Sequence, residues 1–140
     1  MTEVEPAVEP APTGDDLLAQ SRQYHLLALP MFVMSSFPTD AGMAAVAEAT
    51  QAHLDYWAKL EEDGVMFAGG PMLPELGSDA WLGDGMIIFK AQSLAAAQAI
   101  VEADPMHASG ARRYRVRPWL VNEGTISVKL SFASGRFELA

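Results

Sequence analysis

Cysteine is absent from the 140-residue sequence, which excludes a disulfide scaffold, a thiolate nucleophile and a Cys-ligated zinc or iron–sulfur site. Basic residues are also scarce: nine Lys and Arg stand against eighteen Asp and Glu, so the formal net charge is −9. A chain this acidic argues against nucleic acid as a partner. The sequence contains no run of 18 apolar residues, so we expect no membrane partner. With neither cysteine nor an export signal, we expect a cytoplasmic protein.

The negative charge is concentrated at the start of the chain. Five of the first sixteen residues are acidic, none is basic, and three prolines lie in the same stretch. Such a composition buries too little apolar surface to offset the entropy of ordering, so residues 1–14 are predicted to be a disordered acidic tail. Residues 15–29 are predicted to form an extra N-terminal helix, stopped by Pro30. A core domain at 30–123 and a C-terminal strand extension at 124–140 follow.

Half of the sequence is apolar and 19% is charged, which suffices for one globular core in a chain of this length. Apolar periodicity and breaker residues divide the rest of the chain into strands and helices. In chain order, the predicted elements are a strand at 30–37, a helix at 41–63, strands at 65–71 and 85–91, a helix at 94–103, and strands at 111–121, 124–132 and 136–139. The strand at 65–71 is expected to be buried and to break at Gly69.

The helix at 41–63 has the clearest periodicity. Six residues fall on one face at steps of three and four, namely Met43, Val46, Thr50, His53, Trp57 and Leu60. Thr39 or Asp40 is predicted to cap its start and Gly64 to end it. Ser93 is predicted to cap the second helix. Because His53 lies in the middle of the apolar face, its ring is expected to point toward the sheet.

The element order from 30 to 121 is β-α-β-β-α-β. Two such βαβ units predict an α+β fold of the ferredoxin-like type, with one antiparallel sheet and both helices on one face. Apolar residues nevertheless occur on both phases of two strands, at residues 31–34 and 86–89. A sheet that is apolar on both faces needs a second cover. We therefore expect a homodimer whose sheets pack face to face.

Four short motifs occur in a fixed order, namely His53 in QAHLDYWAKLEEDG, Gly70-Pro71 in FAGGP, Asp104-Pro105 in EADPMHASG and Arg117-Pro118-Trp119 in RVRPW. Over residues 30–123 they resemble the YciI-like (YCII-related) proteins. The resemblance implies the dimeric α+β barrel fold, an active-site pair formed by His53 and Asp104, and a pocket beside Gly70 and Pro71. One branch of that family contains a lyase that removes chloride from a chlorinated hydroxyquinol, and related barrels include lactone isomerases and quinone-forming oxygenases.

The chain departs from the family pattern in three places. Met106 follows the Asp-Pro motif where an aromatic residue is usual, which changes the wall of the implied pocket and bears on whether a family substrate carries over to this chain. The first 29 residues are additional. The segment from Gly124 onward extends past the common core, where it bears on whether dimers associate into a higher homo-oligomer.

Two interpretations of the implied pair stay open. His53 is either a core histidine satisfied by its neighbours or a general acid/base, since histidine beside a carboxylate exchanges protons near neutral pH. Asp104 either accepts from backbone amides in a turn, as Asp before Pro often does, or orients the His53 ring and stabilises its cation. Both roles of Asp104 are compatible, because a carboxylate has about four acceptor positions.

The other two histidines carry weaker indications. His107 is either an exposed loop residue or a second histidine of the pocket. Together with His53 and Asp104 it would complete a two-histidine, one-carboxylate metal set, but nothing in the spacing fixes that geometry, so we expect neither a metal nor another cofactor. His25 is interpreted as a structural residue of the extra helix.

Arginines cluster near the end of the core domain, at positions 112, 113, 115 and 117. On a strand, the side chains of Arg113, Arg115 and Arg117 share one face, opposite Tyr114 and Val116. This face is either solvated or ion-paired between subunits, or it is a patch that attracts an anionic substrate.

Further residues are predicted to contact a substrate beside Gly70, Pro71 and His107. Trp81 lies in the loop after the Gly-Pro turn, where it would cover an aromatic ligand. Ser35, with Ser36, would hydrogen-bond a ligand at the end of the first strand. Met106 and Trp119 complete the predicted set.

Two hypotheses about function follow. The first is a cofactor-independent enzyme of the lyase or isomerase type, in which His53 and Asp104 move a proton on a phenolic, quinoid or lactone compound during elimination, dehydrochlorination or tautomerisation. The alternative is a non-catalytic dimeric module that binds a small ligand or modulates a partner through the same pocket.

Overall fold

The computed structural model describes residues 10–77 and 80–139. The chain divides into two compact units, one formed by Pro30–Leu120 and the other by the end segments Met1–Leu29 and Val121–Ala140. Among the described residues, no helix is both long and apolar enough to cross a membrane.

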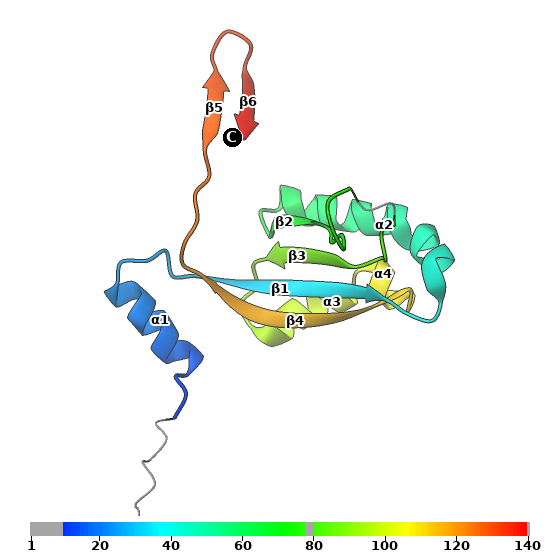
Figure 1. Ribbon diagram of the computed structural model, residues 1–140, viewed down its shortest axis with the longest axis horizontal. Coiled ribbons are helices and arrows are strands. Elements are labelled where there is room, and N and C mark those ends of the chain that lie inside the picture. The colour runs from blue at the N-terminus through cyan, green and yellow to red at the C-terminus, as the bar shows by residue number, and fades with distance from the viewer. Residues whose placement is uncertain (1–9, 78–79, 140) are drawn as a thin grey trace, which may run out of the picture. The chain divides into compact units, whose positions relative to one another are not determined.

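The unit Pro30–Leu120 is built on a four-stranded sheet with the strand order β2-β3-β1-β4 (Figure 1). Its elements are β1 (Leu29–Pro38), α2 (Gly42–Glu62), β2 (Met66–Pro71), β3 (Gly85–Phe89), α3 (Leu94–Glu102), α4 (Pro105–Ala108) and β4 (Arg112–Val121). β3 pairs antiparallel with both β1 and β2. This confirms the predicted ferredoxin-like arrangement, to which the short helix α4 is added between α3 and β4.

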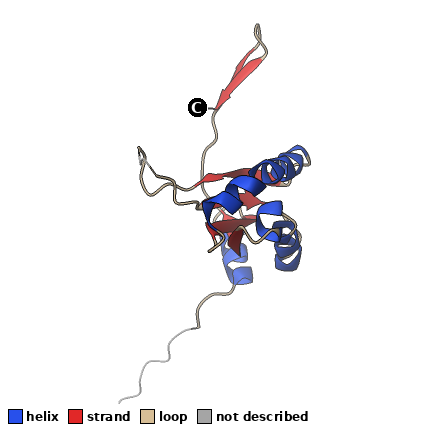
Figure 2. Cartoon of the chain, turned by 90° about the vertical axis from the view of Figure 1, so that its right-hand side faces the viewer, coloured by secondary structure: helices blue, strands red, loops and turns tan. Residues whose placement is uncertain are grey.

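The core lies between the sheet and the helices of this unit, which gather on one face of it (Figure 2). The buried cluster consists of Phe32 and Met34 from β1, Ile87 and Phe89 from β3, Trp57 from α2, and Ala97 and Val101 from α3. Alternate residues of β1 and β3 point to the helices, and the strand register places Phe32 opposite Phe89 and Met34 opposite Ile87. Full burial of each large side chain contributes about 1.5–3 kcal/mol.

The C-terminus of α2 is fixed by backbone geometry. Gly64 has a φ angle of +71°, and its N–H donates to the Glu61 carbonyl at 3.0 Å while the Val65 N–H donates to the Leu60 carbonyl at 2.8 Å. These two bonds form a Schellman motif, which requires a left-handed residue where Gly64 stands. Leu60 and Val65 both pack against the core cluster, so the motif also sets the direction of the chain entering β2.

The predicted cap at the start of α2 is wrong. Ala41 is the N-cap residue and makes no side-chain capping bond. Thr39 instead donates its hydroxyl to the Gly110 carbonyl at 2.7 Å, which ties the end of β1 to the start of β4. By contrast, Ser93 caps α3 as predicted, accepting from the Ala96 N–H at 3.1 Å.

The prediction that residues 65–71 form a buried strand broken at Gly69 is also wrong. β2 continues through Pro71 and is mostly exposed, because it is the edge strand of the sheet and pairs there with β3. An edge strand tolerates Pro71, since one side of its backbone needs no ladder bond. The register shifts between Met66 and Ala68, as in a β-bulge.

The second unit contains α1 (Gly14–Gln23) and the hairpin of β5 (Val128–Ser131) and β6 (Arg136–Leu139). A capping box between Thr13 and Asp16 starts α1. The helix is shorter than the predicted 15–29, because His25 and Ala28 have positive φ angles that interrupt a helix. Residues 1–9 of the predicted tail lie outside the described residues.

Replacing Gly64 tests the Schellman motif. We expect Gly64→Ala to lower the free energy of unfolding by about 1 kcal/mol, because a Cβ is unfavourable at positive φ. Gly64→Asn is the matched control, since Asn tolerates this conformation, and its loss should be clearly smaller. Nothing lies within 4 Å of the added Cβ, so steric contact does not contribute. Urea unfolding of both variants measures the difference, and equal losses would contradict the backbone explanation.

Candidate functional site

Asp104 is a fully buried carboxylate at the junction of α3 and α4. It is the N-cap residue of α4 and accepts a hydrogen bond from the Met106 N–H at 2.9 Å. Pro105 occupies the first position of that helix, where its missing N–H costs nothing. The local sequence Asp-Pro therefore fixes both the turn and the place of the carboxylate.

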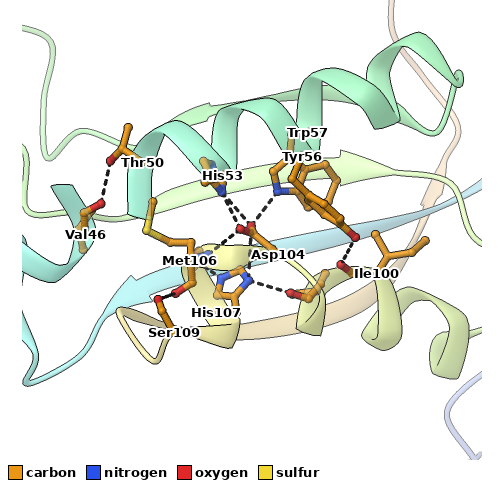
Figure 3. Close-up of polar contacts among 12 residues, drawn as sticks. Val46, Thr50, His53, Tyr56, Trp57, Ile100, Asp104, Met106, His107 and Ser109 are labelled. Atoms are coloured by element: carbon orange, nitrogen blue, oxygen red, sulfur yellow. Dashed lines mark hydrogen bonds and ion pairs between the residues drawn. The ribbon is translucent and has the colours of Figure 1, made fainter. Parts of the chain in front are cut away.

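α2 supplies two further donors to the same carboxylate (Figure 3). His53 Nδ1 lies 2.8 Å from Oδ2 and 3.0 Å from Oδ1 of Asp104, and Trp57 Nε1 donates to Oδ2 at 2.7 Å. These two residues are four apart, so they lie one above the other on the same face of the helix. Asp104 therefore makes both contacts that the sequence left open, to the backbone and to His53. Trp57 was not predicted as a site residue, although its spacing from His53 placed it on the same face.

The hydrogen bonds determine the charge of Asp104. Burial raises its pKa, but the bonds from His53, Trp57 and the Met106 amide lower it by more, so the pKa lies below the ordinary value of an aspartate. Because an ionised carboxylate only accepts hydrogen bonds, Nδ1 of His53 carries a proton. The other ring nitrogen, Nε2, then carries the lone pair of the neutral ring and can accept a proton.

His107 is buried rather than exposed in a loop, since its side chain is 2% exposed and belongs to α4. Its Nδ1 lies 3.0 Å from the Val101 carbonyl, and its Nε2 lies 2.9 Å from the hydroxyl of Ser36. A ring that donates through Nδ1 accepts through Nε2, so Ser36 is the donor in this second bond. Burial lowers the pKa of His107, against the opposing effect of Asp104, and the ring is therefore held neutral.

A cavity of about 430 Å³ adjoins these groups. Five of the predicted site residues line it, namely His53, Gly70, Pro71, Trp81 and Met106. Most of the wall is apolar, from methionine, leucine, isoleucine and proline side chains, and the polar residues Ser36, Thr50, His53 and Arg112 interrupt it. His53 keeps 18% of its side-chain surface exposed, so the ring is open on one side.

Four predicted residues do not line this cavity. Ser35 lies one position from Ser36 on β1, and because successive residues of a strand point to opposite faces, Ser36 is the one that reaches it. His107 lies behind Ser36 and contacts the cavity through that hydroxyl. Trp119 is exposed on β4. Asp104 is also outside the lining, since it contacts His53 from behind.

Arg112 lines the cavity, although its place in the sequence indicated no role apart from the arginine cluster. The alternation of side chains along β4 could have indicated that Arg112 points inward, since it shares a strand face with Tyr114 and Val116 rather than with Arg113. The guanidinium lies over the Trp81 ring, 5.4 Å from the ring centroid, as in a cation–π contact. Burial lowers its pKa, against the attraction of Asp84 and Asp104.

No group of three His, Asp or Glu side chains within residues 10–77 and 80–139 is placed to hold a metal ion. In both His53 and His107 the nitrogen nearest Asp104 is Nδ1, at 2.8 and 3.6 Å. Each Nδ1 faces an oxygen acceptor, so it carries a proton instead of the lone pair that a metal needs.

The neutral, buried His107 makes stability depend on pH. With a lowered pKa in the folded state, the unfolded chain takes up the proton first as the pH falls. Stability is then complete above the ordinary histidine pKa of about 6.5 and decreases as the pH falls toward the folded-state pKa. We expect His107→Gln, which keeps a donor and an acceptor, to weaken this decrease. Urea unfolding at a series of pH values from about 7 to 5 measures it.

His25→Asn is the control for this experiment. His25 is exposed and has a φ angle of +58°, which Asn tolerates. This variant should keep the pH dependence of the wild type. Asp104 does not confuse the result, because its lowered pKa removes stability only below about pH 4. A His107→Gln protein that loses stability with falling pH as steeply as the wild type would contradict the assignment.

Among solved structures, one similar chain is the 5-chloro-2-hydroxyhydroquinone dehydrochlorinase (TftG) from Burkholderia phenoliruptrix AC1100, in complex with 2,5-dihydroxybenzoquinone. It is 22% identical, the alignment covers 64% of this chain and 92% of that chain, and the TM-score is 0.55. At this identity the likeness establishes a shared fold. A search of curated proteins gives no match.

The comparison with family models matches residues 30–120 to the YCII-related domain. The matched range covers most of the chain and contains His53, Gly70-Pro71, Asp104-Pro105 and Arg117-Pro118-Trp119, from which the resemblance was recognised. That resemblance is confirmed: the chain belongs to the YCII-related domain family.

Proposed function

We propose that this chain is a small-molecule enzyme of the lyase or isomerase type, in which His53 and Asp104 perform acid–base chemistry without a cofactor. The observation that carries the proposal is the 2.8 Å contact between His53 Nδ1 and the buried Asp104 carboxylate, at the wall of a mainly apolar cavity. General acid–base catalysis requires such an oriented histidine next to a partly dry binding site. Membership of the YCII-related family and the dehydrochlorinase neighbour support the same class of reaction.

Asp104 decides which nitrogen of His53 reacts. With the proton on Nδ1, Nε2 carries the lone pair of the neutral ring and takes a proton from a substrate hydroxyl or carbon. The carboxylate stabilises the imidazolium that forms. In an elimination, the electron pair left on the substrate expels the leaving group as an anion. In a tautomerisation, the imidazolium returns the proton to a second atom of the same substrate.

The cavity favours a small ring compound. Its volume of about 430 Å³ is at the lower end of the range for ligand sites. Apolar walls suit the faces of a ring, and Ser36, Thr50 and His53 offer polar groups for its substituents. The neighbouring enzyme acts on a chlorinated hydroxyhydroquinone. For this chain we propose phenolic, quinoid or lactone substrates.

The test is turnover of a substrate panel by wild type, His53→Gln and Asp104→Asn. Chloride release from chlorinated hydroquinones and absorbance changes of quinones and lactones report the candidate reactions. We expect kcat to fall by about 10²- to 10⁴-fold in both variants, because either change removes proton transfer or the correct tautomer. His25→Asn should keep full activity. If panel compounds bind and none is turned over, and His53→Gln binds them unchanged, the non-catalytic binding module is favoured instead.

We also propose that the enzyme is a homodimer. The sheet face opposite the helices carries Val33 and Ser35 of β1 beside Ile88 and Met86 of β3, their register partners. All four are half-buried within one chain, and three of them, Val33, Met86 and Ile88, are apolar. A second copy of the chain carries the same apolar face, so two copies can cover each other.

The homodimer is tested by light scattering during size-exclusion chromatography. We expect a dimer for the wild type and a monomer for Val33→Glu, because a carboxylate would be buried without a partner at the centre of the proposed interface. Ala58→Glu, on the exposed face of α2, adds the same charge elsewhere and should stay dimeric. A wild-type monomer would exclude this assembly.

A further inference from the structure

Arg112 differs from the other arginines of β4 in its surroundings. It is the first residue of the strand and its side chain is on the face covered by helices, with a residue exposure of 7%. Arg113, Arg115 and Arg117, on the alternate phase, are exposed. Arg112 also lines the cavity that His53 lines. A buried cation at the wall of an apolar cavity requires an explanation, because charged groups are rarely buried unless they are paired.

One edge of its guanidinium lacks partners. Nε and Nη2 are both buried, and neither has a hydrogen-bond partner among the described residues. The N–H bonds of these two nitrogens are parallel and form a fork that donates hydrogen bonds to the two oxygens of a carboxylate. Both nitrogens expose almost no surface as the side chain stands, so binding of a ligand to them requires a turn about the side-chain torsions of Arg112.

Within residues 10–77 and 80–139, no acid forms an ion pair with the Arg112 guanidinium. Asp84 and Asp104 are the acids that act on Arg112 electrostatically. The oxygens of Asp104 are engaged by His53, Trp57 and the Met106 amide. Among the residues that the structure describes, Arg112 is therefore not half of a salt bridge.

The neighbouring residues make room for the guanidinium. A Cβ on Gly85 would lie 3.2 Å from Arg112 Nη1, so the glycine at the start of β3 leaves space that a larger residue would take. Trp81 covers the group from the loop side through the contact between its ring and the guanidinium. Trp81 and Gly85 line the same cavity. The space left by Gly85 and the ring of Trp81 thus both place the Arg112 guanidinium beside the cavity.

We infer that Arg112 binds the negative charge of the substrate, so that the site takes a ring compound bearing an anionic group with two coplanar oxygens. A carboxylate, or the ionised hydroxyl of a hydroxyquinone next to a carbonyl oxygen, has this chemistry. Because Arg112 and His53 line one cavity, an anion held by the fork presents its ring to Nε2 of His53. The inference deepens the proposed function, since it names the substrate class of the same cavity.

The test compares charged and neutral ligands of the same shape. Benzoate and benzamide form one pair, and 2-hydroxy-1,4-benzoquinone and its methyl ether form the second. We expect titration calorimetry of the wild type to give about 10- to 100-fold tighter binding of the anion in at least one pair, as charge-assisted hydrogen bonds provide. The pair with the larger ratio identifies the source of the oxygens.

Three variants assign that preference to Arg112. Arg112→Gln should abolish it, and Arg112→Lys, which keeps the charge and loses the fork, should retain only part of it. Arg115→Gln is the control, an exposed arginine of the same strand, and should behave as the wild type. A purely structural role for Arg112 would change melting temperature without changing the ratio between charged and neutral ligands.

Several results would overturn the inference. They are equal binding of both members of each pair by the wild type, no binding of either anion, and a preference that persists in Arg112→Gln. If Arg112→Gln fails to fold, the wild-type ratios and Arg112→Lys still decide. His53→Gln separates this inference from the proposed function, because it should lose turnover and keep the preference for anions. If the wild type prefers anions but turns over no compound of the panel, Arg112 remains the anion site and the proposed enzymatic function is contradicted.

Discussion

A carboxylate without access to water needs protein donors for its oxygens, and Asp104 obtains them from two directions. α2 contributes the His53 and Trp57 side chains, and the first turn of α4 contributes the Met106 amide. Removing any one donor would leave part of a buried charge unpaired, which costs more than an exposed bond would gain. The position of α2 over the sheet and the orientation of the catalytic candidate His53 are therefore tied to one group.

A negative and a positive charge are buried next to one apolar cavity, and they differ in their hydrogen-bond partners. The oxygens of Asp104 accept hydrogen bonds from the protein, and one of these bonds fixes the orientation of the His53 ring. Arg112 keeps Nε and Nη2 unpaired among the described residues, and on this we base the proposal that its positive charge binds an anion. His107 and Ser36 lie between α4 and β1 as a neutral hydrogen-bonded pair. A neutral link there avoids a second buried cation, which burial makes costly.

Local sequence signals predicted a large part of this structure. Apolar periodicity gave the order of strands and helices, and Ser93 and Gly64 were correctly assigned as helix ends, because caps depend on a few neighbouring residues. Motif order identified the family and brought His53 and Asp104 together as a pair. The predicted N-cap of α2 was wrong, because the Thr39 hydroxyl donates to the Gly110 carbonyl instead. No pattern within one helix reveals a competing acceptor so distant in sequence.

The sequence by itself thus determined the fold class, the family and the pair of side chains at the centre of the site. Only the tertiary structure decided that Ser36 rather than Ser35 reaches the cavity, that His107 is buried behind it, and that Arg112 faces inward with Nε and Nη2 unpaired among the described residues. The physical reason is the two-residue period of a strand together with long-range packing. A shift of one position reverses the face of every side chain, and which face meets the helices is settled by contacts between distant segments.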